Sequence, residues 1–201
     1  KGNSSFQIRS FLSRLRWNSH FIQRFEMEPS IEFGSVNRGY EELNKKKIKK
    51  YYESWENGKT GYPLVDASIL CLKSTGYLNF RMRSMIVSFL THHLWQPWQS
   101  ASHFLAQNFL DFEPGIHYSQ LQMQAGETGV NTIRIYNPTK NAFEKDKKAN
   151  FIKKWLPQLR ELPIPLIYEP WKMSEIEQKL FNCEIGKDYP KPIVDISETR
   201  K

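Results

Sequence analysis

Three stretches near the middle of this chain decide its fold. Residues 55–67 read WENGKTGYPLVDA, residues 75–83 read TGYLNFRMR, and residues 134–138 read RIYNP. Pro63 suits the first turn of a helix, where its missing N–H is harmless, and Gly76 suits a left-handed C-terminal cap. These two residues predict a helix between them, and its apolar stripe consists of Val65, Ile69 and Leu72.

A second predicted helix runs from about Leu78 to Leu94 and is apolar over much of its surface, which indicates a central, buried element. Its apolar residues are Met82, Met85, Ile86, Val87, Phe89 and Leu90. Arg81 and Arg83 lie near its start. Because a buried guanidinium group needs a paired charge or an anionic ligand, these arginines are the first indication of a functional site.

On the N-terminal side, apolar residues recur at spacings of three and four from Phe6 to Glu28, which predicts one helix or two end to end. Pro29 marks its end. Residues 30–54 are polar and irregular, and residues 45–50 contain five lysines. Such a run is usually a solvated, self-repelling surface, and contact with nucleic-acid phosphates is the alternative.

On the C-terminal side, a third helix is expected from about Trp98 to Leu110, followed by an acidic turn. Residues 115–133 show no clean period and predict an ordered loop with short helical pieces, where functional groups concentrate. Another helix is expected over roughly residues 147–156, and the proline-rich residues 163–170 are expected to be extended.

Residues 174–177 read SEIE, a capping box that predicts a short final helix. The sequence has no internal repeat and no alternating strand pattern of useful length. The chain therefore predicts an all-α fold, with residues 1–201 forming a single domain.

The composition favours an anionic partner. Twenty-nine Lys and Arg against 21 Asp and Glu give a formal net charge of +8. This balance suits nucleic acid, an acidic membrane surface or a phosphorylated cofactor, although a plain basic face is equally compatible. Cys71 and Cys183 are isolated, so they indicate neither a disulfide framework nor a zinc site and favour a reducing, cytoplasmic setting. No apolar run approaches the roughly 18 residues of a membrane span.

Several familiar catalytic motifs are absent. Residues 58–60 read GKT, but the earlier glycine of a phosphate-binding loop would fall at Glu53. The five histidines show no spacing typical of a catalytic metal, so no metal site is expected. No G-x-S-x-G elbow occurs.

The remaining chemistry-bearing residues are spread over separate predicted helices and one loop. They are Trp17, Arg81, Arg83, Asp111, Glu113 and His117. From the residues alone, an arginine and an aspartate on neighbouring buried helices form a structural ion pair more often than a site.

The three quoted stretches, in their order and content, resemble the flavin-binding half of the DNA photolyase and cryptochrome family. The resemblance covers nearly the whole chain. It implies the helical, C-terminal FAD-binding domain of that family, with FAD as cofactor. The family's N-terminal α/β antenna-binding domain and the Thr- and Ser-rich segment that clasps the flavin diphosphate have no counterpart in these residues.

The resemblance also implies roles for individual residues. In the family, the second of the two arginines pairs with an aspartate beside the flavin, and these positions match Arg83 and Asp111. The acidic turn that contacts the cofactor corresponds to residues 111–113, which are Asp111, Phe112 and Glu113. Trp17 corresponds to a tryptophan that packs by the cofactor. His117 falls where the family places the residue that faces flavin N5, and an imidazole there could exchange a proton.

Other positions depart from the family pattern. Of the three tryptophans that commonly carry electrons, Trp98 matches the middle one, whereas the flavin-proximal position is Leu121 and no outermost tryptophan is found. On the expected DNA side, Phe80 replaces an asparagine before Arg81, and Met123 replaces a tryptophan that stacks on the lesion.

The resemblance implies a divergent photolyase domain that uses light-driven electron transfer from reduced flavin to split pyrimidine dimers in DNA. Its expected partner is UV-damaged DNA, contacted by Phe80, Arg81 and Met123, with Trp98 in electron transfer and neither a membrane nor a metal involved. Two alternatives stay open: a cryptochrome-like flavoprotein without repair activity, and a flavin-free helical module that binds nucleic acid.

Overall fold

The elements of this protein are all helical in the part of the chain that the structure, a computed structural model, describes, namely residues 2–130 and 132–199. The α-helices are α1 (Gly2–Met27), α2 (Lys49–Glu56), α3 (Pro63–Thr75), α4 (Phe80–Ser88), α5 (Gln99–Asn108), α6 (Pro114–Ala125), α7 (Pro138–Lys145), α8 (Asn150–Trp155) and α9 (Glu175–Leu180). The predicted all-α fold is confirmed.

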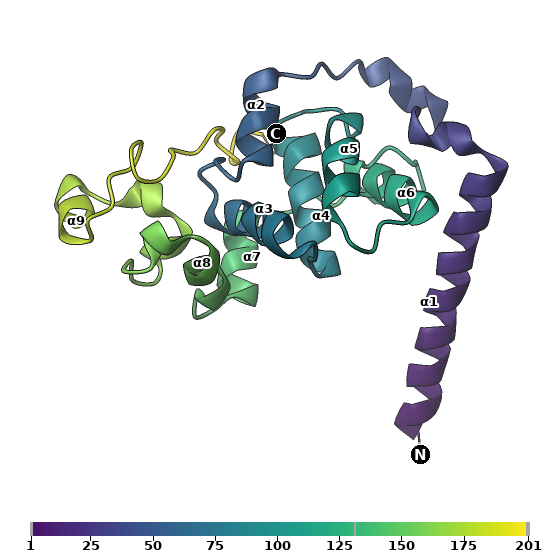
Figure 1. The fold of residues 1–201 in the computed structure, drawn as a ribbon, viewed down its shortest axis with the longest axis horizontal. Helices are drawn as coiled ribbons and strands as arrows, with labels where there is room; N and C mark the ends of the chain where they lie inside the picture. The colour runs from purple at the N-terminus through teal and green to yellow at the C-terminus, as the bar shows by residue number, and fades with distance from the viewer. Residues whose placement is uncertain (1, 131, 200–201) are drawn as a thin grey trace.

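Helices α3 and α4 lie at the centre of the molecule (Figure 1). Helix α3 starts at Pro63 and ends at Gly76, which takes the predicted left-handed conformation with φ 70° and donates its N–H to Leu72. The side chain of Asn79 caps α4 by accepting from the Met82 N–H. Helix α4 then continues into a π-helical turn, Phe89–His93, so the buried helix expected from 78 to 94 is confirmed.

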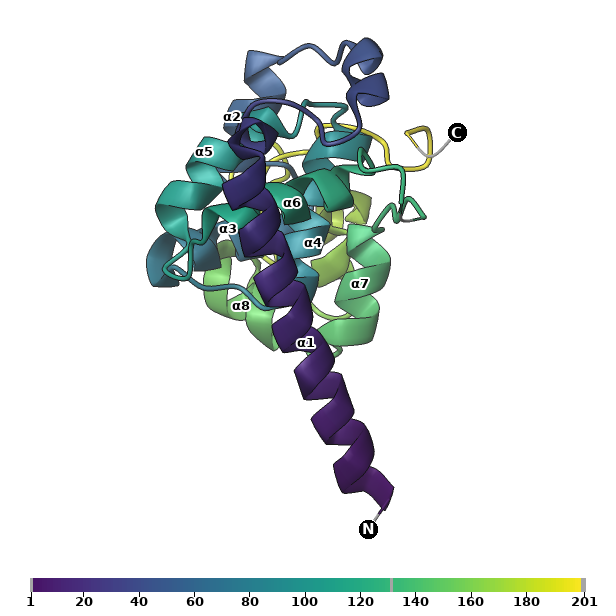
Figure 2. The ribbon, with the colours of Figure 1, turned by 90° about the vertical axis from the view of Figure 1, so that its right-hand side faces the viewer.

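Helix α1 runs away from the other helices, and its N-terminal end lies far from them (Figures 1 and 2). Its residues 5–20 are exposed on every side. Only its last turns pack on the body, where Phe21 and Ile22 approach Gly115 at the start of α6. A Cβ on Gly115 would lie 2.7 Å from the Phe21 carbonyl oxygen, so this close backbone approach requires glycine.

Residues 115–133 were predicted to be an ordered loop with short helical pieces, whereas the structure has one continuous helix over the first half of this range. Helix α6 begins there because Glu113 accepts from the Ile116 N–H, Pro114 occupies the first position and Gly126, at φ 75°, ends the helix. The apolar period was hidden because α6 buries polar side chains, among them Ser119 and Gln122.

Residues 30–54 were predicted to be irregular, which the structure corrects, and their lysine run to be solvated, which holds for Lys46, Lys47, Lys49 and Lys50 but not for Lys45. Two short 3₁₀ turns, Pro29–Glu32 and Arg38–Leu43, precede α2 in this segment. The Lys45 side chain is only 4 % exposed, because its Nζ lies 3.0 Å from the Glu127 carboxylate. A partner 82 residues away thus removes the first lysine of the run from solvent.

The C-terminal region contains the predicted capping box at α9, where Ser174 and Glu177 satisfy each other's backbone N–H groups. The proline-rich stretch is not extended as predicted, since residues 166–168 and 170–172 form 3₁₀ turns. The last segment returns to the core, where the Tyr189 hydroxyl donates to Asp66 at 2.6 Å. The structure also contains α7, which the sequence analysis did not predict and which Asn137 caps.

Candidate functional site

A hollow of about 220 Å³ lies between α4, the end of α5, the turn that follows it and α6. Its walls are mostly apolar and its polar groups converge from three directions, which is the usual make-up of a small-molecule site. It is lined by Phe80, Arg83, Ser84, Val87, Leu105, Phe109, Asp111, Phe112, Glu113, Ile116, His117, Gln120, Leu121 and Gln124. We call this hollow the α4–α6 pocket.

The strongest charged contact of the pocket joins α4 to the turn after α5. The Arg83 Nη2 lies 2.9 Å from Oδ2 of Asp111, and the guanidinium stacks 4.1 Å from the centre of the Phe109 ring. The Asp111 side chain is more than half exposed, so it keeps accepting capacity toward the pocket. The pairing expected of Arg83 and Asp111 is therefore present, while their role toward a cofactor stays a prediction.

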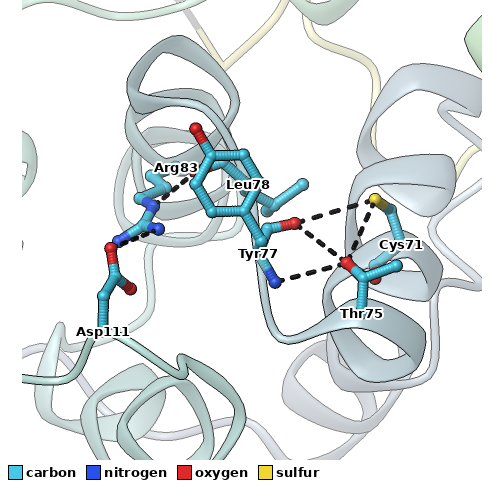
Figure 3. A network of polar contacts seen from close by, with 6 residues as sticks. All are labelled: Cys71, Thr75, Tyr77, Leu78, Arg83 and Asp111. Carbon is cyan, nitrogen blue, oxygen red and sulfur yellow. Dashed lines mark hydrogen bonds and ion pairs between the residues drawn. The ribbon is translucent and has the colours of Figure 1, made fainter.

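The loop between α3 and α4 fixes the orientation of Arg83 (Figure 3). The Arg83 Nε donates to the Leu78 carbonyl at 2.7 Å, and the Tyr77 ring centre lies 5.5 Å from the guanidinium carbon. This loop is tied back to α3 because the Thr75 hydroxyl donates to the Cys71 carbonyl and the Cys71 thiol contacts the Tyr77 carbonyl. The guanidinium is thus held from two sides before any ligand arrives.

His117 contributes a neutral imidazole to the pocket. Its Nε2 lies 2.9 Å from the Ser102 carbonyl oxygen, which can only accept, so Nε2 carries the proton and Nδ1 has a free lone pair. Burial lowers the pKa of His117, and the positive charge of Arg83 lowers it further, against the effect of the Ser102 carbonyl. The side chain therefore stays neutral at physiological pH.

Two other polar side chains, from the N-cap of α6 and from α6 itself, line the same pocket. Glu113 uses one carboxylate oxygen to cap α6 and has the other available. The Oε1 of Gln120 is buried and has no hydrogen-bond partner among the described residues. A buried acceptor without a donor costs free energy, so a ligand N–H at this position would be stabilising.

The structure does not bring all the predicted site residues together. Phe80 lines the pocket and is 65 % exposed at its edge, whereas Arg81 is exposed on α4 and Met123 is half-buried on α6, outside the lining. Trp98 is fully buried outside the lining, and its Nε1 has no partner among the described residues. Trp17 lies on α1 within its exposed residues 5–20, is 52 % exposed and does not line the pocket.

Sequence reasoning missed part of the lining, including Gln120 and Gln124. A signal was present, because residues 113, 117, 120, 121 and 124 follow the spacing of one helix face. The sequence did not predict this helix because most residues of the face are polar, whereas helical periodicity is recognised from apolar residues.

Neither a cluster of metal-ligating side chains nor a membrane-spanning helix is present among the described residues. No three or more His, Cys, Asp or Glu side chains gather there into a possible metal site. In the same part of the chain, no helix has the length and apolar character needed to cross a membrane.

The sequence matches the family model of the FAD binding domain of DNA photolyase over residues 11–201. Among curated proteins, a deoxyribodipyrimidine photo-lyase of Alkalihalophilus pseudofirmus is 34 % identical over 98 % of this chain and 42 % of its own length. A cryptochrome DASH of Gloeobacter violaceus is 34 % identical over 74 % of this chain and 30 % of its own length.

Solved structures agree with these sequence matches. A bacterial class III photolyase from Agrobacterium tumefaciens superposes with a TM-score of 0.89 at 27 % identity, covering all of this chain and 43 % of that one. An archaeal photolyase from Sulfolobus tokodaii with two FAD molecules gives a TM-score of 0.84 at 29 % identity, covering 94 % and 42 % of the two chains. This chain thus spans less than half the length of these relatives.

Proposed function

This chain belongs to the DNA photolyase and cryptochrome family, as an FAD-binding domain, and we propose that it places the flavin ring of FAD in the α4–α6 pocket and repairs pyrimidine dimers in DNA. The observation that carries this proposal is the Arg83–Asp111 pair, which faces the pocket beside a neutral His117.

The residues of the pocket fit a flavin ring. An isoalloxazine has apolar faces and one edge that carries carbonyl oxygens and an N–H. The apolar walls suit its faces, while Arg83 offers donors, Asp111 offers an acceptor and the orphan Oε1 of Gln120 needs a donor. At about 220 Å³ the hollow is smaller than most ligand pockets, which hold about 300–1,000 Å³, so it suits the ring rather than the whole dinucleotide.

Each side chain has a distinct task under this proposal. Arg83 and Asp111 orient the ring edge, and the loop at Leu78 keeps the guanidinium from rotating away. His117 holds its proton on Nε2, so its Nδ1 can accept a proton or a hydrogen bond inside the pocket. Reduced FAD, when bound, supplies the electron that light transfers to a pyrimidine dimer, which splits and returns the electron.

DNA is the proposed partner, and we expect its damaged bases to enter the α4–α6 pocket at the edge where Phe80 lies. The exposed Phe80 ring can stack on a base that is extruded from the duplex, and Arg81, one residue further along α4, can pair with a phosphate. Met123 offers an adaptable apolar surface on α6, and Trp98 is proposed to carry electrons through the core. The two free cysteines support a reducing, cytoplasmic setting as part of the proposal.

A cryptochrome-like flavoprotein without repair activity is the second candidate. It is favoured by Met123, which cannot stack on a lesion as an indole would, and relatives named as cryptochromes match this chain nearly as well as photolyases. A flavin-free helical module is the third candidate.

One experiment separates the three. The 201-residue protein is mixed with FAD, freed of unbound flavin and given a single-stranded oligonucleotide that contains one thymine dimer, with a reductant, in blue light or in the dark. The proposal predicts visible flavin absorption and loss of the dimer only in light. Bound flavin without loss of the dimer would indicate a cryptochrome-like flavoprotein, and absence of flavin uptake would overturn the flavoprotein assignment.

A further inference from the structure

We propose that a second surface, formed by Lys45–Lys50, Tyr52 and Trp95, binds single-stranded nucleic acid through its phosphates and unpaired bases. We call it the lysine–tryptophan surface. None of its residues lines the α4–α6 pocket, so the inference goes beyond the proposed flavin site. The segment lies beside α2, at the top of Figure 1.

Trp95 is the unusual residue of this surface. It has φ 52°, in the left-handed region that a bulky side chain rarely adopts, and its side chain is 52 % exposed. The backbone at Trp95 is therefore strained although the indole stays half in water and gains little hydrophobic stabilisation from burial. Strain of this kind concentrates at binding sites, which makes Trp95 a candidate stacking platform.

Contacts between distant segments fix the surface before any ligand binds. The Lys45 Nζ lies 4.6 Å from the centre of the Trp95 ring while it pairs with Glu127. The Gln96 side chain accepts from the Ile48 N–H at 2.6 Å, which joins the lysine run to the residue after Trp95. Preorganisation of this kind lowers the entropy cost of binding.

The charge of the surface is poorly compensated. Lysines 46, 47, 49 and 50 are exposed, and within residues 2–130 and 132–199 their only ion pair is a 3.7 Å surface contact from Lys49 to Glu53. Lys49 and Lys50 occupy the first turn of α2, which has no acidic residue there and no side-chain cap at Ile48. Because a helix N-terminus already carries partial positive charge, these lysines destabilise the free protein and would be stabilised by a phosphate.

The aromatic residues select the kind of anion. Besides Trp95, the Tyr52 ring has the Lys47 Nζ 4.0 Å from its centre, so cations and aromatic rings alternate over the surface. Base stacking on aromatic rings next to phosphate-binding lysines is how proteins bind single strands without sequence preference. A duplex hides its base faces, and lipid headgroups offer no ring to stack, so a single strand fits best.

The test measures binding of a fluorescein-labelled, lesion-free oligothymidylate to the flavin-free 201-residue protein in the dark. Trp95→Gly should weaken binding about fivefold or more, since stacking contributes roughly 1–3 kcal/mol per base. Its melting temperature should not fall, because glycine adopts φ 52° without strain. Trp95→Phe keeps a ring and should bind like the parent protein.

The lysines are tested by Lys46→Ala, Lys47→Ala and Lys50→Ala combined. The slope of log affinity against log salt should become shallower by about 2, at roughly 0.7 per phosphate on a single strand. The control removes two lysines elsewhere, by Lys153→Ala with Lys154→Ala on α8, where Lys154 also lies over an indole, 5.1 Å from the Trp155 ring. This control should leave the affinity of the protein within about twofold.

Three results would overturn the proposal: unchanged affinity in Trp95→Gly, equal binding of duplex and single-stranded DNA, or anionic vesicles that displace the oligonucleotide. Neither light, lesion nor flavin enters the assay. Its failure would therefore leave the flavin assignment intact, and failure of flavin binding would leave this surface intact.

Discussion

At the scale of single residues, Arg83 shows how one side chain becomes a binding group. Its side chain is three-quarters buried, and the guanidinium contacts the Leu78 carbonyl, the Asp111 carboxylate and the Phe109 ring. A planar fork is needed for this arrangement, because a lysine ammonium cannot donate in two fixed directions while it stacks on a ring.

The change Arg83→Lys should therefore reduce FAD affinity about tenfold or more, because hydrogen bonds to charged groups contribute roughly 1.5–3 kcal/mol. The free energy of unfolding should change by no more than about 1 kcal/mol, since Asp111 is largely exposed. Equilibrium titration with FAD and urea unfolding measure the two quantities.

The control for this variant is Glu169→Gln, which breaks the 2.8 Å ion pair with Lys172 away from the pocket. It should leave FAD affinity unchanged. If Arg83→Lys binds FAD as well as the parent protein does, the role of the Arg83–Asp111 pair is refuted.

At the scale of elements, the contact of α1 with α6 depends on the absence of a side chain at Gly115. A Cβ there would lie 2.8 Å from the Cα of Ile22 and 2.7 Å from a carbonyl oxygen, and backbone atoms cannot turn aside as a flexible side chain can. The same α6 carries His117 and Gln120 into the pocket, so the position of α6 links α1 to the site.

Gly115→Ala should separate the two helices and destabilise the protein by about 1–3 kcal/mol. In this variant we expect amide hydrogen exchange to be faster in residues 21–27 than in α3, because α1 has few other contacts with the rest of the protein. Gly39→Ala is the matched control, since its new Cβ would meet only a side-chain oxygen at 3.3 Å. Equal exchange in the two variants would show that the close approach is not required.

At the scale of the whole molecule, Asp66 ties the C-terminal segment to the central helix. Its carboxylate is fully buried and accepts from the Thr60 N–H and hydroxyl, the Gly61 N–H and the Tyr189 hydroxyl. Burial raises the pKa of Asp66 to about 6, and the hydrogen bonds from Thr60 and Tyr189 only partly offset this effect. The folded state thus favours the protonated form.

This shift predicts how Asp66 contributes to stability against pH. Between the unfolded pKa of about 4 and the folded pKa of about 6, the folded state binds more protons, so the contribution rises as pH falls through this range. A shift of about two units corresponds to roughly 3 kcal/mol at most. The carboxylate is ionised in both states above pH 7, where this gain is absent.

Asp66→Asn removes the titrating group and one acceptor for the donors around it. Urea unfolding at pH 7.5, 6, 5 and 4.5 should show that the free energy of unfolding of the parent protein, minus that of this variant, increases as pH falls. Burial lowers the pKa of His92 and His117, so protonation of these histidines destabilises both proteins in acid. Because both proteins share this effect, it cancels in the difference between their free energies of unfolding. A gap that stays constant with pH would contradict the raised pKa.

Local sequence by itself determined the all-α fold, the limits of α3, the capping box of α9 and, through the resemblance, the pairing of Arg83 with Asp111. Helix caps and apolar stripes involve residues only three or four positions apart, so they can be recognised from the sequence alone. Only the tertiary structure decided that Lys45 is buried, that α6 buries the polar side chain of Gln122 and that Trp17 lies away from the pocket. Each of these depends on partners remote in the chain, such as Glu127 for Lys45, because a polar group can be buried only where a distant partner satisfies it.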